Sequence, residues 1–486
     1  MCLALYSTRI ILQALGQTDY GIYMLVAGVV SMLSFVTNAL VTTTQRYLSF
    51  YQGKGDTQQV SHVFGNSMIL HIVIGLIVFL LLAISDIPLV YSVLNIEQER
   101  ETTAAVVFLL TSIMFFFSIV IAPVRALLFS HENIVYISLI DVLDGILKLA
   151  CAFILLHLNS DRLIAYSVSM LGIQLFNLVA LALYSALKYE ECHLPKFSEF
   201  DKSCVRDMVS FAGWSVYGSG CVVVRNQGIA IILNQFFGTV INAAYGLSMQ
   251  VAGAVMFISA SIINAVNPQL MKAEGEGNRE KMLRLAEYES KYSFLFLAVV
   301  SLPMVFEMET LLQLWLTDVP ENTVQFCQLV ILATLCDQLT IGLTAANQAT
   351  GDIRHYTLVF YSLKLLTLLA IIICLSADVA VSKVLWCYVA VELLCSVVRL
   401  PLLNRQTGLD MAKFCRNVLL RVLMPVAVIL AVCFTCVTFL SVSYRFLLTL
   451  ICSIVAVVPV IWLTTLDPME KQYVKNYITL RHARVG

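Results

Sequence analysis

Residues 20–28 read YGIYMLVAG and residues 245–253 read YGLSMQVAG, with Tyr, Gly, Met, Val, Ala and Gly at matching positions. The match continues on both sides: LG at 15–16 corresponds to FG at 237–238, and GKGD at 53–56 corresponds to GEGN at 275–278. A second, weaker match pairs Asp144 with Lys364. Self-similarity at a near-constant spacing predicts a chain built from two related halves, followed by an unpaired tail.

The composition places most of the chain in lipid. Of the 486 residues, 59% are hydrophobic and 13% are charged, and the mean hydropathy is +0.86. So few charges could not cover the surface of a soluble protein of this length. The net charge of −1 also argues against nucleic acid as a partner.

Apolar stretches long enough to cross about 30 Å of hydrocarbon predict about fourteen transmembrane helices. They are expected near residues 1–15, 20–45, 63–85, 103–127, 134–158, 163–187, 209–236, 240–267, 288–308, 323–347, 353–376, 383–403, 414–440 and 444–466. Backbone groups in lipid must be satisfied within each segment and the alternation of a β-barrel is absent, so the predicted fold is all-α. Since the first stretch is too short to span a membrane, we expect its helix to begin upstream of Met1.

Six helices in each half give both halves the same orientation, which predicts two pseudo-symmetric lobes related as parallel repeats. The expected segments are an N-lobe at 1–187, a cytoplasmic linker at 188–208, a C-lobe at 209–404, an extra helix pair at 405–466 and a cytoplasmic tail at 467–486. Nineteen Lys and Arg fall on one predicted side of the membrane and four on the other, which predicts cytoplasmic N- and C-termini. Gly21 and Gly28, like Gly246 and Gly253, share a helix face and are expected to let a neighbouring helix approach closely.

Charged residues inside the predicted helices are the candidate functional residues. Each costs about 2.5–3.5 kcal/mol if it faces lipid, so such residues normally face a bundle interior or a water-filled cavity. We expect the cations to bind an anionic substrate, and the acids to hold those cations in place or to take up a coupling H⁺ or Na⁺. The cations are Arg9, Lys148, Arg225, Lys364 and Arg399, and the acids are Asp141, Asp144, Asp337 and Glu392.

The spacing of these residues leaves a second interpretation open for some of them. Asp144 and Lys148 lie one helical turn apart and could form a self-neutralised pair that only stiffens a helix contact. Lys364 and Arg225 have no acid nearby on their own helices and need a partner from another helix or a cavity. Lys291 and Arg421 lie near predicted helix ends, where a long basic side chain can reach the membrane surface.

No arrangement in the sequence predicts an enzyme, a metal site or a bound cofactor. The 14 Cys have no metal-ligand spacing, and most lie in apolar stretches where they behave as small hydrophobic residues. His71 and His157 have no Cys, Asp or Glu at ligand spacing. A Gly-rich phosphate loop and a Ser/His/Asp arrangement on a soluble domain are both absent.

Three segments carry a resemblance to a known family: TRIILQALGQTDYGIYMLVAGVVSM at 8–32, NQFFGTVINAAYGLSMQVAG at 234–253 and NPQLMKAEGEGN at 267–278. With the predicted helix count, they resemble the polysaccharide and O-antigen flippases of the multidrug/oligosaccharidyl-lipid/polysaccharide exporter superfamily, particularly the branch common in Bacteroidota. Many relatives carry Asp in the seventh helix where this chain has Arg225, Asn226 and Gln227. That departure favours an anion-facing role for Arg225 over cation coupling at this helix.

The resemblance implies a function. It implies that two lobes around a central cavity move undecaprenyl-pyrophosphate-linked oligosaccharide from the cytoplasmic to the periplasmic leaflet of a bacterial inner membrane by alternating access. The implied partners are the lipid-linked oligosaccharide, membrane lipids, and a glycan polymerase and glycosyltransferases. Two alternatives stay open: a multidrug exporter coupled to H⁺ or Na⁺, and, more remotely, a membrane-embedded glycan polymerase or ligase.

Overall fold

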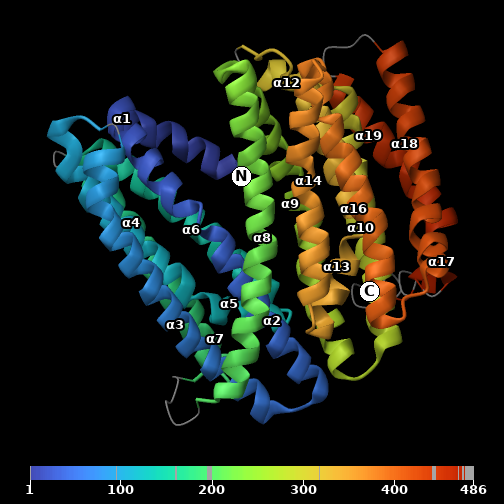
Figure 1. Ribbon diagram of the computed structural model, residues 1–486, viewed down its shortest axis with the longest axis horizontal. Coiled ribbons are helices and arrows are strands. Elements are labelled where there is room, and N and C mark those ends of the chain that lie inside the picture. Colours follow the sequence, from blue (N-terminus) through green and yellow to red (C-terminus); the bar gives the residue numbers. More distant parts are fainter. Residues whose placement is uncertain are drawn as a thin grey trace, which may run out of the picture. The chain divides into compact units, whose positions relative to one another are not determined.

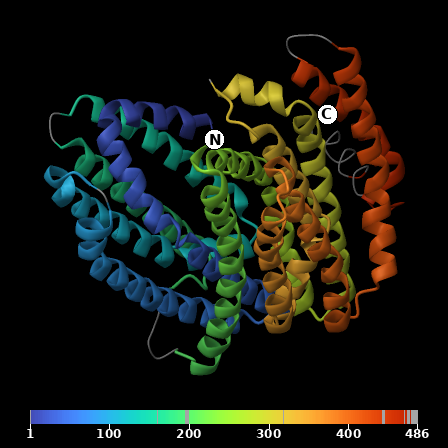
Figure 2. The same ribbon diagram turned by 45° about the horizontal axis from the view of Figure 1, so that its top comes forward.

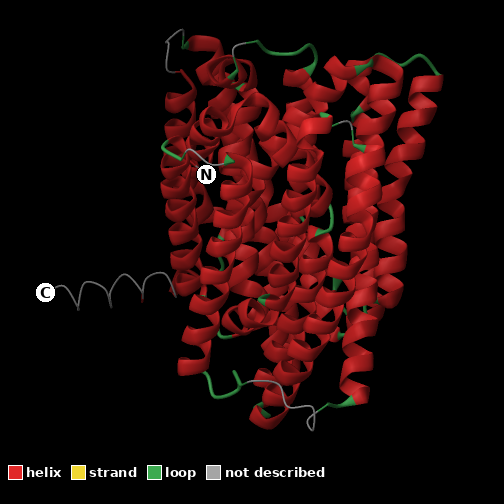
Figure 3. Ribbon diagram, turned by 90° about the vertical axis from the view of Figure 1, so that its left-hand side faces the viewer, coloured by secondary structure: helices red, strands yellow, loops and turns green. Residues whose placement is uncertain are grey.

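The computed structural model describes residues 2–94, 96–158, 161–193, 200–316, 318–440, 445–468, 470–472 and 476. Within these ranges every regular element is helical (Figure 3). The chain divides into two compact units: unit 1 comprises Met1–Gly220 and Met271–Gly277, and unit 2 comprises Cys221–Leu270 and Asn278–Gly486. The segment boundaries predicted for the two lobes stay a prediction.

Unit 1 is a bundle of long helices in which α3 packs on α4, α4 on α7, α1 on α6 and α2 on α5. Figure 1 shows α3, α4 and α7 running side by side. The helices are α1 (Cys2–Ser31), α2 (Ser34–Lys54), α3 (Thr57–Pro88), α4 (Glu101–Val120), α5 (Ala122–Ser130), α6 (Ile134–Leu156), α7 (Arg162–Lys188) and the first half of α8 (Lys202–Phe237). Short helical turns at Leu89–Val93 and Gln98–Arg100 link α3 to α4.

Unit 2 begins in the second half of α8, and it includes most of α9 (Thr239–Gly275). In it α16 packs on α12 and α14, and α10 packs on α12, α13, α18 and α19. Figure 2 shows these helices, coloured green to red, as one bundle. The remaining helices are α10 (Arg279–Phe306), α11 (Met308–Trp315), α12 (Thr323–Gln338), α13 (Ile341–Thr350), α14 (Arg354–Ser376), α15 (Val381–Val384), α16 (Trp386–Thr407), α17 (Met411–Phe414), α18 (Leu420–Phe439) and α19 (Arg445–Val460).

The helices confirm the predicted class, a multi-pass helical membrane protein. Among the described residues, ten helices are long and apolar enough to cross a membrane, or up to twelve if each of two bent pairs is one span. The bent pairs are Thr18–Ser31 with Ser34–Lys54, at 41°, and Thr323–Gln338 with Ile341–Thr350, at 44°. The helix expected at 134–158 is present as α6, which carries three of the predicted charged residues.

The repeated sequence corresponds to a repeated local structure. Gly16 and Gly238, which occupy matching positions, both have φ 79° and both interrupt a helix. Gly55 directly follows α2 and Gly277 lies two residues beyond α9, with φ 71° and 74°. In this left-handed region a side chain would be strained, so glycine is needed for the conformation. The next residue starts the following helix in both halves: the Asp56 side chain accepts a hydrogen bond from Gln59 N at 3.0 Å, and the Asn278 side chain accepts one from Lys281 N at 3.0 Å. The matched segments thus share turn geometry as well as amino-acid sequence.

Close helix approach occurs at a different pair of glycines from those predicted. A Cβ added at Gly21, Gly28, Gly246 or Gly253 would meet no atom within 4 Å, so the close packing expected at these four positions is wrong. A Cβ at Gly53 would lie 2.1 Å from Lys272 O, and one at Gly275 would lie 2.0 Å from Phe50 O. Gly53 and Gly275 occupy matching positions in the repeat, and each faces the backbone of the other's helix.

The first residues of the segment predicted as a linker are attached to unit 1. Glu191 Oε1 lies 2.7 Å from His131 Nε2, and His193 Nε2 lies 2.8 Å from Ser61 Oγ. The ring of Tyr189 stacks on that of His131, with centroids 4.1 Å apart. The hydrogen bond from His131, which outweighs partial burial, holds the pKa of the Glu191 carboxyl below its ordinary value.

One basic residue lies deeper than predicted. Arg46, one residue beyond the helix predicted at 20–45, lies within α2 and is buried. Its guanidinium stacks on Tyr47 and Phe50, each with the ring centroid 4.6 Å away. Aromatic faces therefore offset part of the cost of burying this charge.

We expect Gly53→Ala to destabilise the protein by about 1–3 kcal/mol, because backbone atoms would have to move apart to admit the methyl group. Gly21→Ala is the matched control: its Cβ enters open space within a helix, so stability should be unchanged or slightly higher. Thermal unfolding of the purified variants in detergent measures both effects. Equal melting temperatures for the two variants would contradict the close approach at Gly53.

Because the pKa of Glu191 is depressed in the folded state, its hydrogen bond with His131 stabilises the protein above the unfolded pKa, and that stability is lost as the pH falls through the folded pKa. We expect Glu191→Gln to lower the free energy of unfolding by at most about 1 kcal/mol near neutral pH, since the pair is partly exposed. The difference should disappear in acid, below the ordinary Glu range near pH 4.5. Unfolding curves of both proteins at several pH values test this, and a difference that grows in acid would refute it.

Candidate functional site

Unit 2 encloses a cavity of about 300 Å³ between α8, α9, α12, α13, α14 and α16. One part of its wall is apolar and comes from residues such as Val222, Met249 and Val330. The rest is ionic. Five charged side chains line it: Arg225 on α8, Asp337 on α12, Lys364 on α14, and Glu392 and Arg399 on α16. We call these five residues the unit 2 charge cluster.

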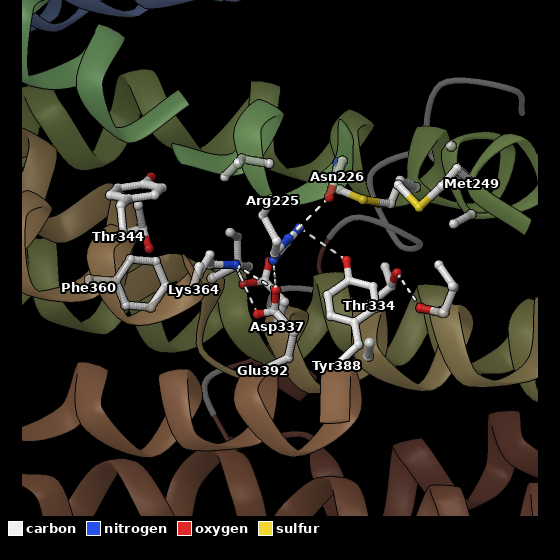
Figure 4. A pocket seen from close by; sticks show the side chains of 18 of the residues that line it. Arg225, Asn226, Met249, Thr334, Asp337, Thr344, Phe360, Lys364, Tyr388 and Glu392 are labelled. Atoms are coloured by element: carbon white, nitrogen blue, oxygen red, sulfur yellow. Dashed lines mark hydrogen bonds and ion pairs between the residues drawn. The ribbon is translucent and has the colours of Figure 1, made fainter. Parts of the chain in front are cut away.

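Arg225 is held by α16. Its guanidinium forms a buried ion pair with Glu392, and Nη2 donates to the Tyr388 hydroxyl at 3.1 Å. The guanidinium also lies over the Tyr388 ring, 4.6 Å from its centroid, and Nε donates to Asn226 Oδ1 at 3.1 Å. Figure 4 shows Arg225 pointing from its helix toward these partners. Only 4% of Arg225 is exposed, so its charge depends on neighbours rather than on bulk water.

Lys364 joins the two acids of the cluster. Its Nζ lies 3.0 Å from Asp337 Oδ1 and 2.9 Å from Glu392 Oε2. The sequence analysis concluded that this lysine needs a partner from another helix, and the structure supplies partners from α12 and α16. The ammonium group also lies 5.2 Å from the centroid of the Phe360 ring, one turn earlier on α14.

Arg399 stabilises the break between α12 and α13. Its Nη2 contacts Asp337 Oδ1 at 2.7 Å, and its Nη1 donates to Asp337 O at 2.7 Å and to Thr340 Oγ1 at 3.0 Å. The carbonyl lies in the last turn of α12, where a cation compensates both the unpaired backbone oxygens and the negative end of the helix dipole. Arg399 therefore makes it possible for a helix to break inside the bundle.

The cluster has an excess of positive charge. Three bases face two acids, so its formal charge is +1 when all five groups are ionised. Lys364, Glu392 and Arg399 are at most 5% exposed, whereas the Asp337 side chain is 20% exposed and is the most open of the five. A buried cluster with a net charge attracts an ion of the opposite sign. Because the formal charge of this cluster is positive, that ion is an anion.

The structure brings five of the nine predicted site residues together. Asp141, Asp144 and Lys148 lie on α6 in unit 1. Lys148 Nζ contacts Asp144 Oδ2 at 2.7 Å and is 45% exposed, which is the self-neutralised pair that the spacing left open. Asp141 pairs with Arg125 at 2.5 Å and is 53% exposed. The side chain of Arg9 lies outside the described residues.

Sequence reasoning missed two kinds of contact. Tyr388 was not singled out, although it lies one turn before Glu392, and that spacing on one helix face could have indicated it. Lys291, interpreted as reaching the membrane surface, is instead buried within α10. Its Nζ contacts Glu470 Oε1 at 2.6 Å, and Tyr292 donates to the same oxygen at 2.7 Å. No local pattern indicates a partner 179 residues away.

The donor set of the cavity does not suit a metal ion. Among the described residues, no three His, Cys, Asp or Glu side chains gather closely enough to hold a metal ion. The two carboxylates of the cluster are each already paired with two bases. What the arrangement can do chemically is to bind charge and to exchange ion-pair partners.

Comparisons with known proteins connect this geometry to a family and a fold. A family model described as a polysaccharide biosynthesis protein matches residues 3–274. The crystal structure of a MATE protein in the straight conformation has a TM-score of 0.74 at 15% identity and covers 84% of this chain and 92% of that chain. A MOP superfamily transporter from Pyrococcus furiosus has a TM-score of 0.73 at 12% identity, with 84% and 92% covered. An outward-facing multidrug resistance MATE family transporter of the MOP superfamily has 0.73 at 14%, with 83% and 91% covered. No curated protein matches the sequence.

We expect Glu392→Ala to destabilise the protein by about 3–5 kcal/mol, because it leaves three buried bases with a single carboxylate. Asp144→Ala, which breaks the partly exposed pair on α6, is the control and should cost at most about 1 kcal/mol. Thermal unfolding in detergent compares the two. If Glu392→Ala were no more harmful than Asp144→Ala, the cluster would not be holding α8, α14 and α16 together.

Proposed function

Because the chain belongs to the polysaccharide biosynthesis protein family, we propose that it moves undecaprenyl-pyrophosphate-linked oligosaccharide across the membrane. The glycan is an O-antigen, capsule or exopolysaccharide repeat unit. Such a molecule has a lipid tail that can stay in hydrocarbon, and a polar glycan and an anionic pyrophosphate that cannot cross unaided. The transporter supplies a polar path for the head group and makes or breaks no covalent bond. Membership of this family and the transporter fold both agree with a chain that is not an enzyme.

The single observation that carries the proposal is the positive surplus of the unit 2 charge cluster. A pyrophosphate that enters the cavity would neutralise this surplus and would accept charge-assisted hydrogen bonds. Lys364 is the most suitable contact, because the two acids that it bridges each keep an arginine partner when it turns away. Arg225 presents a planar fork that suits a phosphate oxygen pair. Lys148, on α6 in unit 1, and Arg9, whose side chain lies outside the described residues, stay predicted substrate contacts.

Asp337 is the proposed coupling group. It contacts both Lys364 and Arg399 and is the most exposed member of the cluster. Uptake of H⁺ or Na⁺ by its carboxylate would weaken both ion pairs and would raise the formal charge of the cluster from +1 to +2. Anion binding and coupling-ion binding would then favour each other, since linkage is reciprocal. Glu392, Asp141 and Asp144 keep the predicted role of counter-ions that hold the bases in place.

We place the protein in the bacterial inner membrane, with both termini in the cytoplasm, because the positive loops are predicted on that side. The substrate then binds from the cytoplasmic leaflet and leaves to the periplasmic leaflet by alternating access of the two lobes. Glycosyltransferases that build the repeat unit and a polymerase that consumes it are the proposed partners.

A multidrug exporter coupled to H⁺ or Na⁺ is the nearest alternative. Cationic drugs need acids in the cavity, and the positive surplus is of the wrong sign for them. For the Pyrococcus furiosus transporter of similar fold, a reversed polarity of the binding pocket suggests a different function, and the same reasoning favours an anionic substrate here. A drug-susceptibility panel in a deletion strain separates the two functions: increased susceptibility with normal surface glycan would favour the exporter.

A glycan polymerase or ligase is the more remote alternative. Such enzymes place catalytic groups at the periplasmic face, usually on a large external loop, and the predicted external loops of this chain are short. The charge cluster offers no nucleophile beside a general base. Release of free undecaprenyl pyrophosphate from the lipid-linked substrate by the purified protein would revive this alternative.

Lys364→Ala should abolish or strongly reduce surface glycan in a complemented deletion strain while the protein is retained. The remaining cluster is neutral and fully paired, so folding should survive, whereas the surplus charge for the substrate is gone. Loss of one charge-assisted contact of about 1.5–3 kcal/mol corresponds to a roughly 10- to 100-fold decrease in transport. Glycan staining and immunoblotting measure the two quantities. Arg225→Ala should also abolish display. Normal display by both Lys364→Ala and Arg225→Ala would remove these residues from the mechanism.

Asp337→Asn mimics the neutral form of the coupling group. We expect it to bind undecaprenyl pyrophosphate in detergent more tightly than the unmodified protein at neutral pH, by roughly 5- to 150-fold, the usual range of coupling between sites. Binding by the variant should also lose its pH dependence. Undecaprenol, which lacks the charged group, is the control ligand and should bind both proteins alike. Weaker binding by the variant would mean that Asp337 is not the coupling site.

A further inference from the structure

Two cysteine thiols meet where α14 ends and α16 begins. Cys374 lies in the last turn of α14, and Cys387 is the second residue of α16. Their Sγ atoms are 3.2 Å apart, and both residues are half-buried. Since a disulfide bond is about 2.05 Å long, an approach of about 1 Å between two side chains already in contact would be enough to form it.

The contact is fixed by the backbone and the core around it. Val379 N donates to Cys374 O at 3.0 Å, and Lys383 N donates to Ala380 O at 2.8 Å, so the connection between the two helices is tightly turned. On either side, Leu375 and Leu385 are buried in the same hydrophobic cluster of unit 2. The two thiols are therefore held in contact by packing.

The predicted orientation places this connection on the oxidising side of the membrane. Residues 377–385 join the eleventh and twelfth predicted helices and therefore face the periplasm when the N-terminus is cytoplasmic. Ala377 and Asp378, beside the thiols, are exposed, so a protein partner can reach this end of the bundle. Disulfides persist in the periplasm, whereas cytosolic thiols are kept reduced.

We propose that Cys374 and Cys387 form a disulfide bond in the mature protein. The oxidant is a periplasmic protein that carries a reactive disulfide. One of the two cysteine thiolates attacks a sulfur of that disulfide, forms a mixed disulfide and releases one thiol of the oxidant. The second cysteine then attacks the mixed bond. In total, Cys374 and Cys387 lose two electrons and two protons, and the disulfide of the oxidant becomes two thiols.

The bond would tie together the two helices that carry most of the charge cluster. Cys387 directly precedes Tyr388, whose hydroxyl accepts a hydrogen bond from Arg225. Lys364 lies on α14, and Glu392 lies on α16. A covalent link at the ends of these helices limits their sliding and so keeps Lys364 and Glu392 in register. The proposal rests on the predicted orientation and on the thiol contact, and it does not require the transport activity.

Peptide mapping of the full chain tests the proposal. Cells are lysed in N-ethylmaleimide with denaturant, so that buried thiols such as that of Cys395 also react, and the purified protein is digested without reductant. We expect a cross-linked peptide containing Cys374 and Cys387 that disappears on reduction and is lost in cells lacking periplasmic thiol oxidation. Cys395, on the same helix, should be recovered alkylated as the internal control. Recovery of both Cys374 and Cys387 as alkylated thiols from normal cells would overturn the proposal.

A second measurement does not depend on the peptide map. Reductant should lower the melting temperature of the purified protein and leave that of the variant carrying Cys374→Ser and Cys387→Ser unchanged. If reductant does not change the melting temperature of the wild-type protein, the proposed stabilising bond is contradicted. Because surface glycan is not the readout, failure of this proposal is distinguishable from failure of the proposed function.

Discussion

Charge compensation within a low-dielectric bundle is the constraint on which unit 2 depends. Arg225, Lys364 and Arg399 come from three different helices, and each is buried beside at least one carboxylate. Isolated, each charge would cost far more than a folded protein can offset. The helices that carry them therefore have to assemble in one arrangement, in which the bases share Asp337 and Glu392. The same pairing leaves one formal positive charge over, and the proposed anionic substrate depends on this remainder.

Breaks in the helices are the second structural requirement, because they put side chains and backbone groups where a straight helix could not. The break between α12 and α13 exposes a backbone carbonyl inside the bundle, and Arg399 satisfies it while also pairing with Asp337. Gly16 and Gly238 interrupt their helices at the same backbone angle. At Gly53 and Gly275, the lack of a side chain lets two backbones touch. Breaks and contacts of this kind let a membrane bundle hold a polar interior without exposing unpaired groups to lipid.

Much of the fold could be predicted from the sequence because lipid imposes a simple length and hydropathy rule. The multi-pass helical class followed from the apolar stretches, and the matched segments share turns at Gly55 and Gly277. The sequence was less reliable about helix ends and faces. Arg46 lies just beyond the helix predicted at 20–45, where a basic side chain is usually solvated, whereas aromatic neighbours bury it. Gly21 and Gly28 match a helix-packing motif, but no atom lies close to either of them. The motif identifies small residues on one helix face and does not show whether another helix packs there.

The sequence by itself determined that ionised residues lie in apolar helices. It also determined that Lys364 and Arg225 need partners from elsewhere, because the spacing of residues along one helix follows directly from the sequence. Only the tertiary structure decided which partners they have. Lys364 meets acids on α12 and α16, Lys148 is paired along its own helix, and Lys291 meets Glu470 near the end of the chain. Partners on one helix are fixed by its period, whereas partners on different helices depend on how helices pack. That packing is set by many weak contacts over the whole bundle, and no short stretch of sequence contains it.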